Sequence, residues 1–253
     1  MAELIFLGTG TSQGVPVIGF KDPVCLSSNA KDKRLRTSAF VKFNNLDLLI
    51  DCGPDFRQQM LREDLCNIDA ILLTHEHADH IGGMDDLRPL NFMRDRGLPI
   101  YGMPRVLESI RIRYAYAFGE NKYPGSPTFE LHEVENEFYI GDLKITPIHV
   151  THGELNILGY KLADLAYITD ASFVAEEEIE KIKRSKILVI NALRKQPHWT
   201  HFNLSQALEL IGKVQPEKAF IVHIGFQMGF HDEVQKELPE NVFLAYDGLR
   251  VVF

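Results

Sequence analysis

Cysteine is scarce in this sequence. Its 253 residues include three cysteines, Cys25, Cys52 and Cys66, an odd number at irregular spacing. A disulfide framework is therefore not expected, and a reducing cytoplasm is the predicted location. No apolar run reaches the roughly 18 residues that could span a membrane, and the N-terminal MAELIFLGTG lacks the basic stretch of a signal peptide. We expect no membrane partner.

The sequence also lacks a Ser/Gly-rich or Pro-rich linker, a low-complexity tract and an internal repeat. We therefore predict a single domain over residues 1–253. The net charge of −8 disfavours a broad nucleic-acid-binding surface, which is usually basic. Apolar residues make up 45% of the chain, enough for a large core.

Short apolar runs alternate with helical patterns along the chain. A hairpin is predicted where TSAFVKF and LDLLID meet at Asn44-Asn45, and a helix from about 82 to 95. Further strands are expected at ELIFLG, DAILLTH, DLKITPIHV, ILGYKL, LAYITD, KILVIN, KAFIVH and VFLAYDG. Further helices are expected at PDFRQQMLRE, PRVLESIRIRYAYAF, AEEEIEKIKR, LSQALELIGK and FHDEVQKEL. Two β-rich stretches with following helices predict a four-layer αββα sandwich, in which two mixed sheets pack face to face with helices outside.

The stretch LTHEHADHIGG places three histidines and an aspartate within six positions: His75, His77, Asp79 and His80. On a helix, His75 and His77 would face different sides, but at a strand end residues two apart point the same way. Asp79 and His80 can then point to a second location. The spacing is typical of two adjacent metal sites. A chance solvated cluster and a purely structural zinc site, which usually uses cysteine and wider spacing, are the less favoured alternatives.

Several predicted strands end in a histidine or an aspartate. LLID ends at Asp51, AILLTH at His75, AYITD at Asp170 and AFIVH at His223. Ligands of open α/β sheets bind just beyond the carboxyl ends of the strands. Packing alone explains such repeated placement poorly, so these residues are candidates for one site.

THEHADH resembles the signature motif of the metallo-β-lactamase superfamily. The remaining elements of that family's pattern are matched in order by Asp51, by His152 in VTHGELNILGY, by Asp170 in AYITDAS and by His223 in AFIVHIGF. The resemblance implies that one metal is held by His75, His77 and His152. It implies that a second is held by Asp79, His80 and His223, with Asp170 bridging the two.

Imidazole and carboxylate ligands suit zinc or manganese. Two such ions would supply a bridging hydroxide as the nucleophile of a hydrolase. Asp79 is therefore also expected to be essential for catalysis, and Asp51 to orient the cluster through a ligand histidine or a backbone donor. His149, three residues before His152, is the alternative third-motif ligand, and we interpret it as a core or supporting histidine.

The stretches GTGTSQGVPVIG and RLRTSAF resemble the 5-phosphoribosyl 1,2-cyclic phosphate phosphodiesterases of phosphonate breakdown and, more distantly, ribonuclease Z. The resemblance points to His201 in THFNLS as the general acid, with Asn203 or Ser205 capping the next helix. His198 is the alternative donor. The Gly-rich stretch is not a P-loop, because no Gly-Lys-Ser/Thr follows it.

Members of that group often carry a further, structural zinc. At the four matching positions this sequence has Phe20, Asp22, Cys25 and Phe226, so three of the expected ligands are absent. We expect no structural zinc here and predict that Phe20 and Phe226 pack together instead.

The sequence thus predicts a dinuclear phosphodiesterase that acts on a small cyclic or nucleotide-like phosphate ester. The alternatives are a tRNA 3′-end endonuclease, a hydrolase of other esters or thioesters, and a metal-bound binding module. Nucleic acid is a possible but not favoured partner, and a homodimer is possible. Basic and aromatic residues intermix between 94 and 123, which suits either a nucleotide-like substrate or a packed surface helix: Arg94, Arg96, Tyr101, Arg105, Arg111, Arg113, Tyr114, Tyr116, Phe118, Lys122 and Tyr123.

Overall fold

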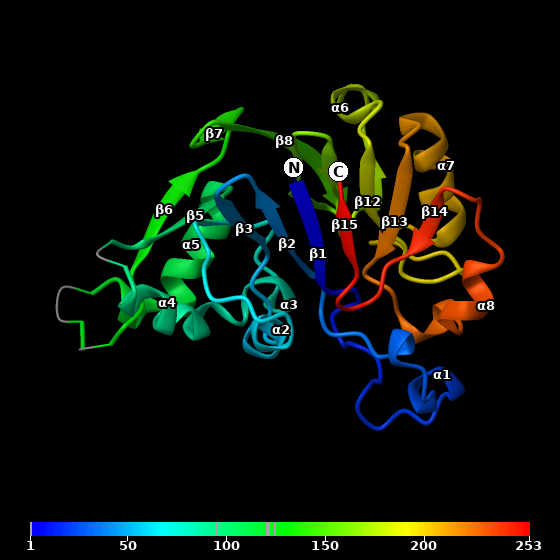
Figure 1. Cartoon of the computed structure of the whole chain (residues 1–253), viewed down its shortest axis with the longest axis horizontal. Helices are drawn as coiled ribbons and strands as arrows, with labels where there is room; N and C mark the ends of the chain where they lie inside the picture. The colour runs from blue at the N-terminus through cyan, green and yellow to red at the C-terminus, as the bar shows by residue number, and fades with distance from the viewer. Residues whose placement is uncertain (1, 95, 120–121, 124) are drawn as a thin grey trace.

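The structure is a computed structural model that describes residues 2–94, 96–119, 122–123 and 125–253. Two mixed β-sheets form its centre (Figure 1). The first sheet has the strand order β15 (Arg250–Val252), β1 (Ala2–Gly8), β2 (Ser38–Phe43), β3 (Leu46–Ile50), β4 (Ala70–Leu72), β5 (Leu98–Gly102) and β6 (Phe129–Glu133). Strands β1 to β3 pair antiparallel, whereas β3 to β6 pair parallel.

The second sheet begins antiparallel and ends parallel in the same way. Its order is β11 (Phe173–Val174), β8 (Leu143–His152), β9 (Leu155–Leu162), β10 (Leu165–Tyr167), β12 (Ile187–Asn191), β13 (Lys218–Val222) and β14 (Val242–Leu244), with β7 (Phe138–Ile140) paired to β8. Strands β10, β12, β13 and β14 run parallel. The carboxyl ends of β10, β12 and β13 therefore lie at one edge of the sheet.

The helices of the N-terminal half are short. They are α1 (Pro23–Leu26), α2 (Phe56–Arg62), α3 (Ala78–Ile81), α4 (Arg88–Phe92) and α5 (Pro104–Arg113), with the 3₁₀ helices η1 (Ala30–Asp32), η2 (Met84–Leu87) and η3 (Ala115–Ala117). The C-terminal half contributes α6 (Glu176–Ile182), α7 (Leu204–Val214), η4 (Phe226–Met228) and α8 (His231–Gln235). None of the helices in the described ranges is long and apolar enough to cross a membrane.

Three apolar layers hold these elements together. Leu4 and Phe6 on β1 face the core between the two sheets, whereas Ile5 and Leu7 on the same strand face the helices outside the first sheet. A third cluster, which includes Ile190 and Leu210, lies between the second sheet and α6 and α7. Strand residues that alternate between two apolar layers explain the near-continuous apolar runs in the sequence. The predicted four-layer αββα sandwich is confirmed.

Some predicted elements differ from the structure. The helix expected from about 82 to 95 is divided into η2 and α4, because Gly82 and Gly83 end α3 and Pro89 starts a new short helix. Asp95, at its predicted end, lies outside the described residues. Strands β5, β6, β7, β11 and β15 were not predicted. The hairpin at Asn44 is confirmed, with a φ of 53° that asparagine tolerates.

Candidate metal centre

The predicted strand-end residues come together at one end of the sandwich. Asp51 follows β3, Asp170 lies three residues after β10, and His223 follows β13. All three have a positive φ, of 61°, 59° and 55° respectively, which turns the chain sharply as it leaves the sheet. Aspartate and histidine adopt this conformation more readily than most side chains do. The turns direct these side chains toward the space between the two sheets.

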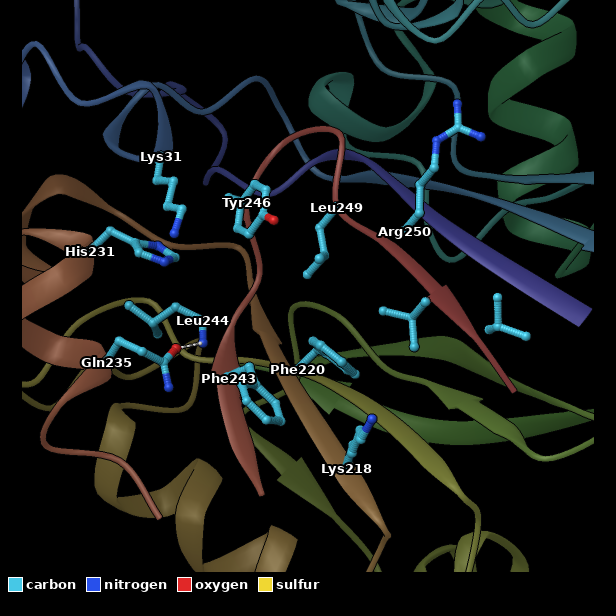
Figure 2. A pocket seen from close by; sticks show the side chains of 12 residues that line it. Lys31, Lys218, Phe220, His231, Gln235, Phe243, Leu244, Tyr246, Leu249 and Arg250 are labelled. Atoms are coloured by element: carbon cyan, nitrogen blue, oxygen red, sulfur yellow. Dashed lines mark hydrogen bonds between the residues drawn. The ribbon is translucent and has the colours of Figure 1, made fainter. Parts of the chain in front are cut away.

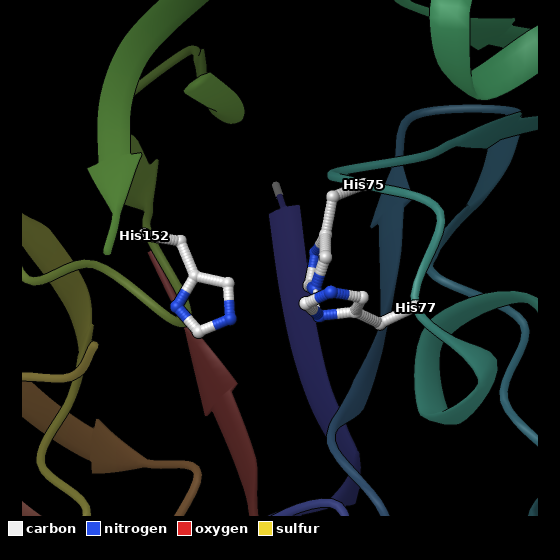
Figure 3. Close-up of side chains that lie close together, drawn as sticks. All are labelled: His75, His77 and His152. Carbon is white, nitrogen blue, oxygen red and sulfur yellow. Dashed lines mark hydrogen bonds between the residues drawn. The ribbon is translucent and has the colours of Figure 1, made fainter. Parts of the chain in front are cut away.

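One group of possible ligands consists of His75, His77 and His152, whose ligand atoms lie within 4.8 Å of one another. Figure 3 shows the His152 ring, from the end of β8, facing the rings of His75 and His77, which come from the loop after β4. Nε2 of His75 and Nδ1 of His77 are 2.9 Å apart. Residues from both sheets thus converge on one point.

A second group lies beside the first and consists of Asp79, His80, Asp170 and His223. His80 Nε2 is 3.2 Å from Asp79 Oδ2 and 3.3 Å from Asp170 Oδ2. Nε2 of His223 is 3.1 Å from the other oxygen of Asp170. A third, overlapping group is formed by His152, Asp170 and His201. Asp170 thus belongs to the second and third groups, and His152 to the first and third.

Hydrogen bonds fix the orientation of two of these imidazoles. His80 Nδ1 donates to Asp51 Oδ2 over 2.7 Å, and His152 Nδ1 donates to the backbone carbonyl of Thr200 over 2.8 Å. The opposite nitrogen of each neutral ring then presents a lone pair to the cluster. Nε2 of His80 is fully buried and has no hydrogen-bond partner among the described residues. This donor set fits a divalent metal ion.

The electrostatics of the cluster favour the protonation states that a metal requires. Burial lowers the pKa of His75 well below its ordinary value, and it lowers the pKa of His223 to about 3. Burial opposes the charged forms of Asp79 and Asp170, but the neighbouring histidines outweigh it and lower both carboxyl pKa values. Neutral imidazoles and ionised carboxylates are the metal-binding forms of these groups.

His80 behaves differently from its neighbours. Burial disfavours its charged form, but Asp170, Asp51 and Asp79 together raise its pKa well above the ordinary value. A proton on this ring would compete with a metal ion for the same lone pair. Metal binding at His80 would therefore release a proton and weaken as the pH falls.

Asp51 stabilises the motif loop, residues 73–83, through hydrogen bonds. Its carboxylate accepts hydrogen bonds from the backbone N–H and the hydroxyl of Thr74, both over 2.8 Å, as well as from His80. Thr74 precedes His75, so Asp51 anchors both ends of the segment that carries the histidines. Asp51 is in none of the possible ligand groups of the described residues.

Two glycines allow the loops of this centre to pack closely. A Cβ on Gly53 would clash with the carbonyl oxygen of Asp79, and a Cβ on Gly83 would clash with the carbonyl oxygen of Gly53. The segment after Asp51 thus lies directly against α3 and the turn that follows it.

The two candidate general acids lie at different depths. His201 Nε2 is 3.2 Å from Asp170 Oδ1, whereas His198 is in no possible ligand group and contacts Thr200 and His201. Asn203 caps α7 in a capping box with Gln206, as one of the two predicted alternatives, and so fixes the loop that carries both histidines.

His149 was interpreted wrongly as a core or supporting histidine. It is exposed on β8, and its backbone N–H donates to Glu178. Residues three apart on a strand face opposite sides, so His149 and His152 cannot share a site.

The Phe20 and Phe226 rings are in contact, with centroids 5.4 Å apart, as predicted. The Asp22 carboxylate accepts a hydrogen bond from the backbone N–H of Val24 and caps α1. The absence of a structural zinc stays a prediction.

Most of the basic and aromatic region between 94 and 123 serves the fold. Tyr114 donates to the carbonyl of Ile81, and Arg111 pairs with Glu108 on the same helix. Arg105 reaches the motif loop, where its Nε lies 2.9 Å from Glu76. Arg105 thus contacts the loop of the histidines, whereas Tyr114 contacts the end of α3.

Sequence reasoning missed four residues that surround the cluster. Thr11 Oγ1 lies 3.2 Å from His223 Nε2, Thr74 Oγ1 lies 3.0 Å from His75 Nδ1, and the Thr200 carbonyl accepts from His152 Nδ1. Trp199 is 75% exposed beside Thr200 and would contact any side chain placed at Gly153. Thr11 lies in the Gly-rich stretch GTGTSQG, which could have pointed to it. The only sequence signal for the other three is that they lie next to or near a candidate histidine in the chain.

Comparisons with known proteins agree with this geometry. The model of the beta-lactamase superfamily domain matches residues 47–224. A crystal structure of a diphosphatase from the PhnP family superimposes with a TM-score of 0.94 at 37% identity, covering 100% of this chain and 98% of that one. An octanoyltransferase of Porphyromonas gingivalis is 42% identical over 98% of this chain, and a ribonuclease Z of Methanopyrus kandleri is 29% identical over 60%.

The chain spans about half the length of these two curated relatives, 51% and 47% respectively. Their names therefore describe proteins with a further portion that this chain does not match. The family match covers the motif histidines, Asp170 and His223. The chain belongs to the beta-lactamase superfamily of metal-dependent hydrolases.

Proposed function

We propose that the chain is a dinuclear phosphodiesterase that hydrolyses a small cyclic or nucleotide-like phosphate ester. The observation that supports this best is the position of Asp170, which belongs to one group of possible ligands with Asp79, His80 and His223 and to another with His152 and His201. Two divalent ions that share a carboxylate are the usual arrangement for phosphoester hydrolysis.

Each residue has a role in this proposal. His75, His77 and His152 would hold one ion, Asp79, His80 and His223 the other, and Asp170 would bridge them. Zinc or manganese suits the nitrogen and oxygen donors. The bound ions would polarise a phosphoryl oxygen and lower the pKa of a water molecule toward neutrality.

The protein's own groups complete the reaction. Cleavage of the ester P–O bond leaves an alkoxide, and His201, next to Asp170, is placed to give it a proton. Asp51 holds the His80 ring in place and leaves its Nε2 available. Both roles require only small movements, because each side chain already lies in contact with the cluster.

The exposed side chains around the cluster favour a substrate with a planar group. Trp199 is 75% exposed beside Thr200, whose carbonyl holds His152, and aromatic rings of this kind stack on bases. Arg105 also lies near the motif loop, where it pairs with Glu76. A nucleotide or cyclic nucleotide therefore fits better than an unsubstituted sugar phosphate.

A second candidate reaction is hydrolysis of a diphosphate bond. It is favoured by the resemblance to the PhnP-family diphosphatase, which extends over the whole chain. The same two-metal chemistry serves P–O–C and P–O–P bonds, so the choice depends on the leaving group. The net charge of −8 makes a long RNA substrate the weaker alternative.

The first experiment is a metal count by mass spectrometry together with an assay of purified protein loaded with zinc or manganese. The substrate panel contains bis-(p-nitrophenyl) phosphate, a cyclic nucleotide, a base-free cyclic ribose phosphate, a nucleoside diphosphate, a pre-tRNA and an octanoyl thioester. We expect about two metals per chain and fastest turnover of the cyclic nucleotide.

The Asp79→Ala variant tests the assignment directly. We expect it to lose turnover and keep its circular dichroism spectrum, because Asp79 is at the surface of the cluster and not in the apolar core. Near-full activity of this variant would refute the proposed centre. If two metals bind but only the thioester or only diphosphates are turned over, the function is hydrolysis of that bond instead.

A further inference from the structure

A second cavity lies away from the metal centre, with a volume of about 430 Å³. It is bordered by β13, β14 and β15, and the last two are the terminal strands of the second and first sheets respectively. Figure 2 shows Lys31, His231 and Tyr246 at one end and Lys218 at the other, with Phe220, Phe243 and Leu249 between them. None of the residues that line it belongs to the metal centre.

The charge of the cavity is opposite to that of the chain. Its lining includes Lys31, Lys218 and Arg250 and no aspartate or glutamate, although the chain as a whole has a net charge of −8. The Arg250 guanidinium turns away to Glu63, over 3.1 Å. Lys31 pairs with Asp232 at 3.8 Å, and Lys218 has no ion pair among the described residues.

A buried histidine adds a fixed hydrogen-bond donor. His231 is 3% exposed, and its Nδ1 lies 3.1 Å from the Nη2 of Arg34. A guanidinium can only donate, so Nδ1 must accept and Nε2 must carry the proton. Burial and the charge of Arg34 lower the pKa of His231 to about 4, which keeps the ring neutral in this tautomer. The Nε2–H has no acceptor among the described residues, and the ring lines the cavity.

The middle of the cavity is apolar. Phe220 and Phe243 are stacked with their ring centroids 5.4 Å apart, and Leu249 and Val251 complete this part of the wall. An apolar wall with a few polar groups at its ends is the usual form of a small-molecule site. A free inorganic anion would leave this wall without a partner, and a neutral lipid would leave the donors without one.

We propose that this cavity binds an anion with an apolar body, such as a medium-chain carboxylate. The carboxylate would accept hydrogen bonds from His231 and Lys31 or from Lys218, and the apolar body would lie against Phe220, Phe243 and Leu249. The site is separate from the metal centre, so it does not depend on the proposed hydrolase activity.

Calorimetric titration of the metal-loaded protein with octanoate tests this directly. Three matched probes each change one property of octanoate. Octanol lacks the charge, octylammonium carries the opposite charge, and acetate lacks the apolar body. Phenylacetate distinguishes an aromatic from an aliphatic body. We expect saturable binding of octanoate or phenylacetate in the millimolar range or tighter, at least tenfold stronger than that of the matched probes.

Three variants locate the binding. Leu249→Trp should fill the cavity and remove octanoate binding, and either Lys31→Glu or Lys218→Glu, depending on which end holds the carboxylate, should weaken it about tenfold or more. Lys21→Glu, an exposed lysine that does not line the cavity, is the charge-matched control and should bind like wild type. Because Leu249 is partly buried, Leu249→Trp is interpreted only if its circular dichroism is native. If it is not, the two lysine variants decide.

The proposal is overturned by equal binding of octanol or octylammonium, by unchanged octanoate binding in both Lys31→Glu and Lys218→Glu, or by no saturable binding of either carboxylate.

Discussion

The two halves of the candidate metal centre are built differently. The motif half comes from one loop and one short helix, and it contains His75, His77, Asp79 and His80. The dispersed half comes from four separate segments, which supply His152, Asp170, His201 and His223. The motif half is held by neighbours close in the chain and by Asp51, whereas the dispersed half is held by the pairing of strands.

The two halves are therefore positioned in different ways. The parallel register that pairs Tyr167 with Val189, and Val189 with Phe220, sets how far Asp170 and His223 extend beyond the sheet. A shift of one residue would turn every side chain to the opposite face. The residues of the motif half are thus brought together by their spacing in the sequence, and those of the dispersed half by the topology of the sheet. The following variants test this distinction, from the largest expected effect to the smallest.

Asp170→Asn should produce the largest effect, because Asp170 belongs to the dispersed half and contacts His80 of the motif half. We expect kcat/KM to fall about a thousandfold or more, which corresponds to a loss of about 4 kcal/mol of transition-state stabilisation. Steady-state kinetics and metal counting measure the change. Full metal content with wild-type kinetics would show that the two halves work independently.

His201→Gln tests whether a residue of the dispersed half acts as a proton donor or only helps to hold metal. A proton donor is needed for an alkoxide and hardly needed for p-nitrophenolate. We therefore expect about a hundredfold or greater loss with a cyclic nucleotide and a much smaller loss with bis-(p-nitrophenyl) phosphate.

His198→Gln is the control for this variant and should retain most activity with both substrates. An equal loss on both substrates in His201→Gln, with fewer metals bound, would instead assign His201 to the metal-holding group that it forms with His152 and Asp170.

Asp51→Asn tests the support of the motif half. An amide cannot accept from both Thr74 groups and from His80 as the carboxylate does. We expect metal affinity to fall roughly 10–100-fold, the range found when a supporting partner of a ligand histidine is removed. Competition with a chelator, followed by metal counting, gives the affinity. Unchanged affinity would mean that the loop holds its shape without Asp51.

Asp247→Asn should have the smallest effect on activity, but it reports on the loop that precedes Thr11. Asp247 accepts from Thr9 over 2.7 Å and from the backbone of Leu35, and burial raises its pKa from 3.8 to about 6. The raised pKa means that Asp247 stays protonated to a higher pH in the folded protein than in the unfolded chain. The contribution of Asp247 to the free energy of unfolding therefore falls as the pH rises from the pKa of the unfolded chain to that of the folded protein. Above the folded-state pKa this contribution is constant.

The Asn variant has no such titration. The difference in unfolding free energy between wild type and Asp247→Asn should accordingly change by on the order of 3 kcal/mol across this interval, since one pKa unit is worth about 1.4 kcal/mol. Urea unfolding at several pH values measures it. Parallel curves for the two proteins would contradict the raised pKa.

Much of the fold could be predicted from local patterns. The apolar runs gave most strands of both sheets, and Asn44-Asn45 marked the first hairpin. The division after Gly82 was missed because a helical pattern continues across two glycines and Pro89. Strands β5 to β7 were missed because they are short and because runs such as LPIYG and FELHE are interrupted by proline, glycine or charged residues.

The candidate site divides in the same way. His75 to His80 could be found from residue type and spacing alone, and the dispersed residues needed the order of a family pattern. The position of His149 could have been settled by strand periodicity, since it lies three residues from His152. Thr74, Thr200 and Trp199 could not, because their roles depend on which loops meet in space.

The close packing at Gly53 and Gly83 limits how the centre could be moved to another protein. A designer who copied LTHEHADHIGG into a new scaffold would transfer the imidazoles and carboxylates. The copied loop would lack the neighbouring segment from Asp51 to Gly53, which lies against the backbone of Asp79 with no room for a single methyl group. The smallest portable unit is therefore two loops from adjacent strands, β3 and β4, and two of its indispensable residues have no side chain at all.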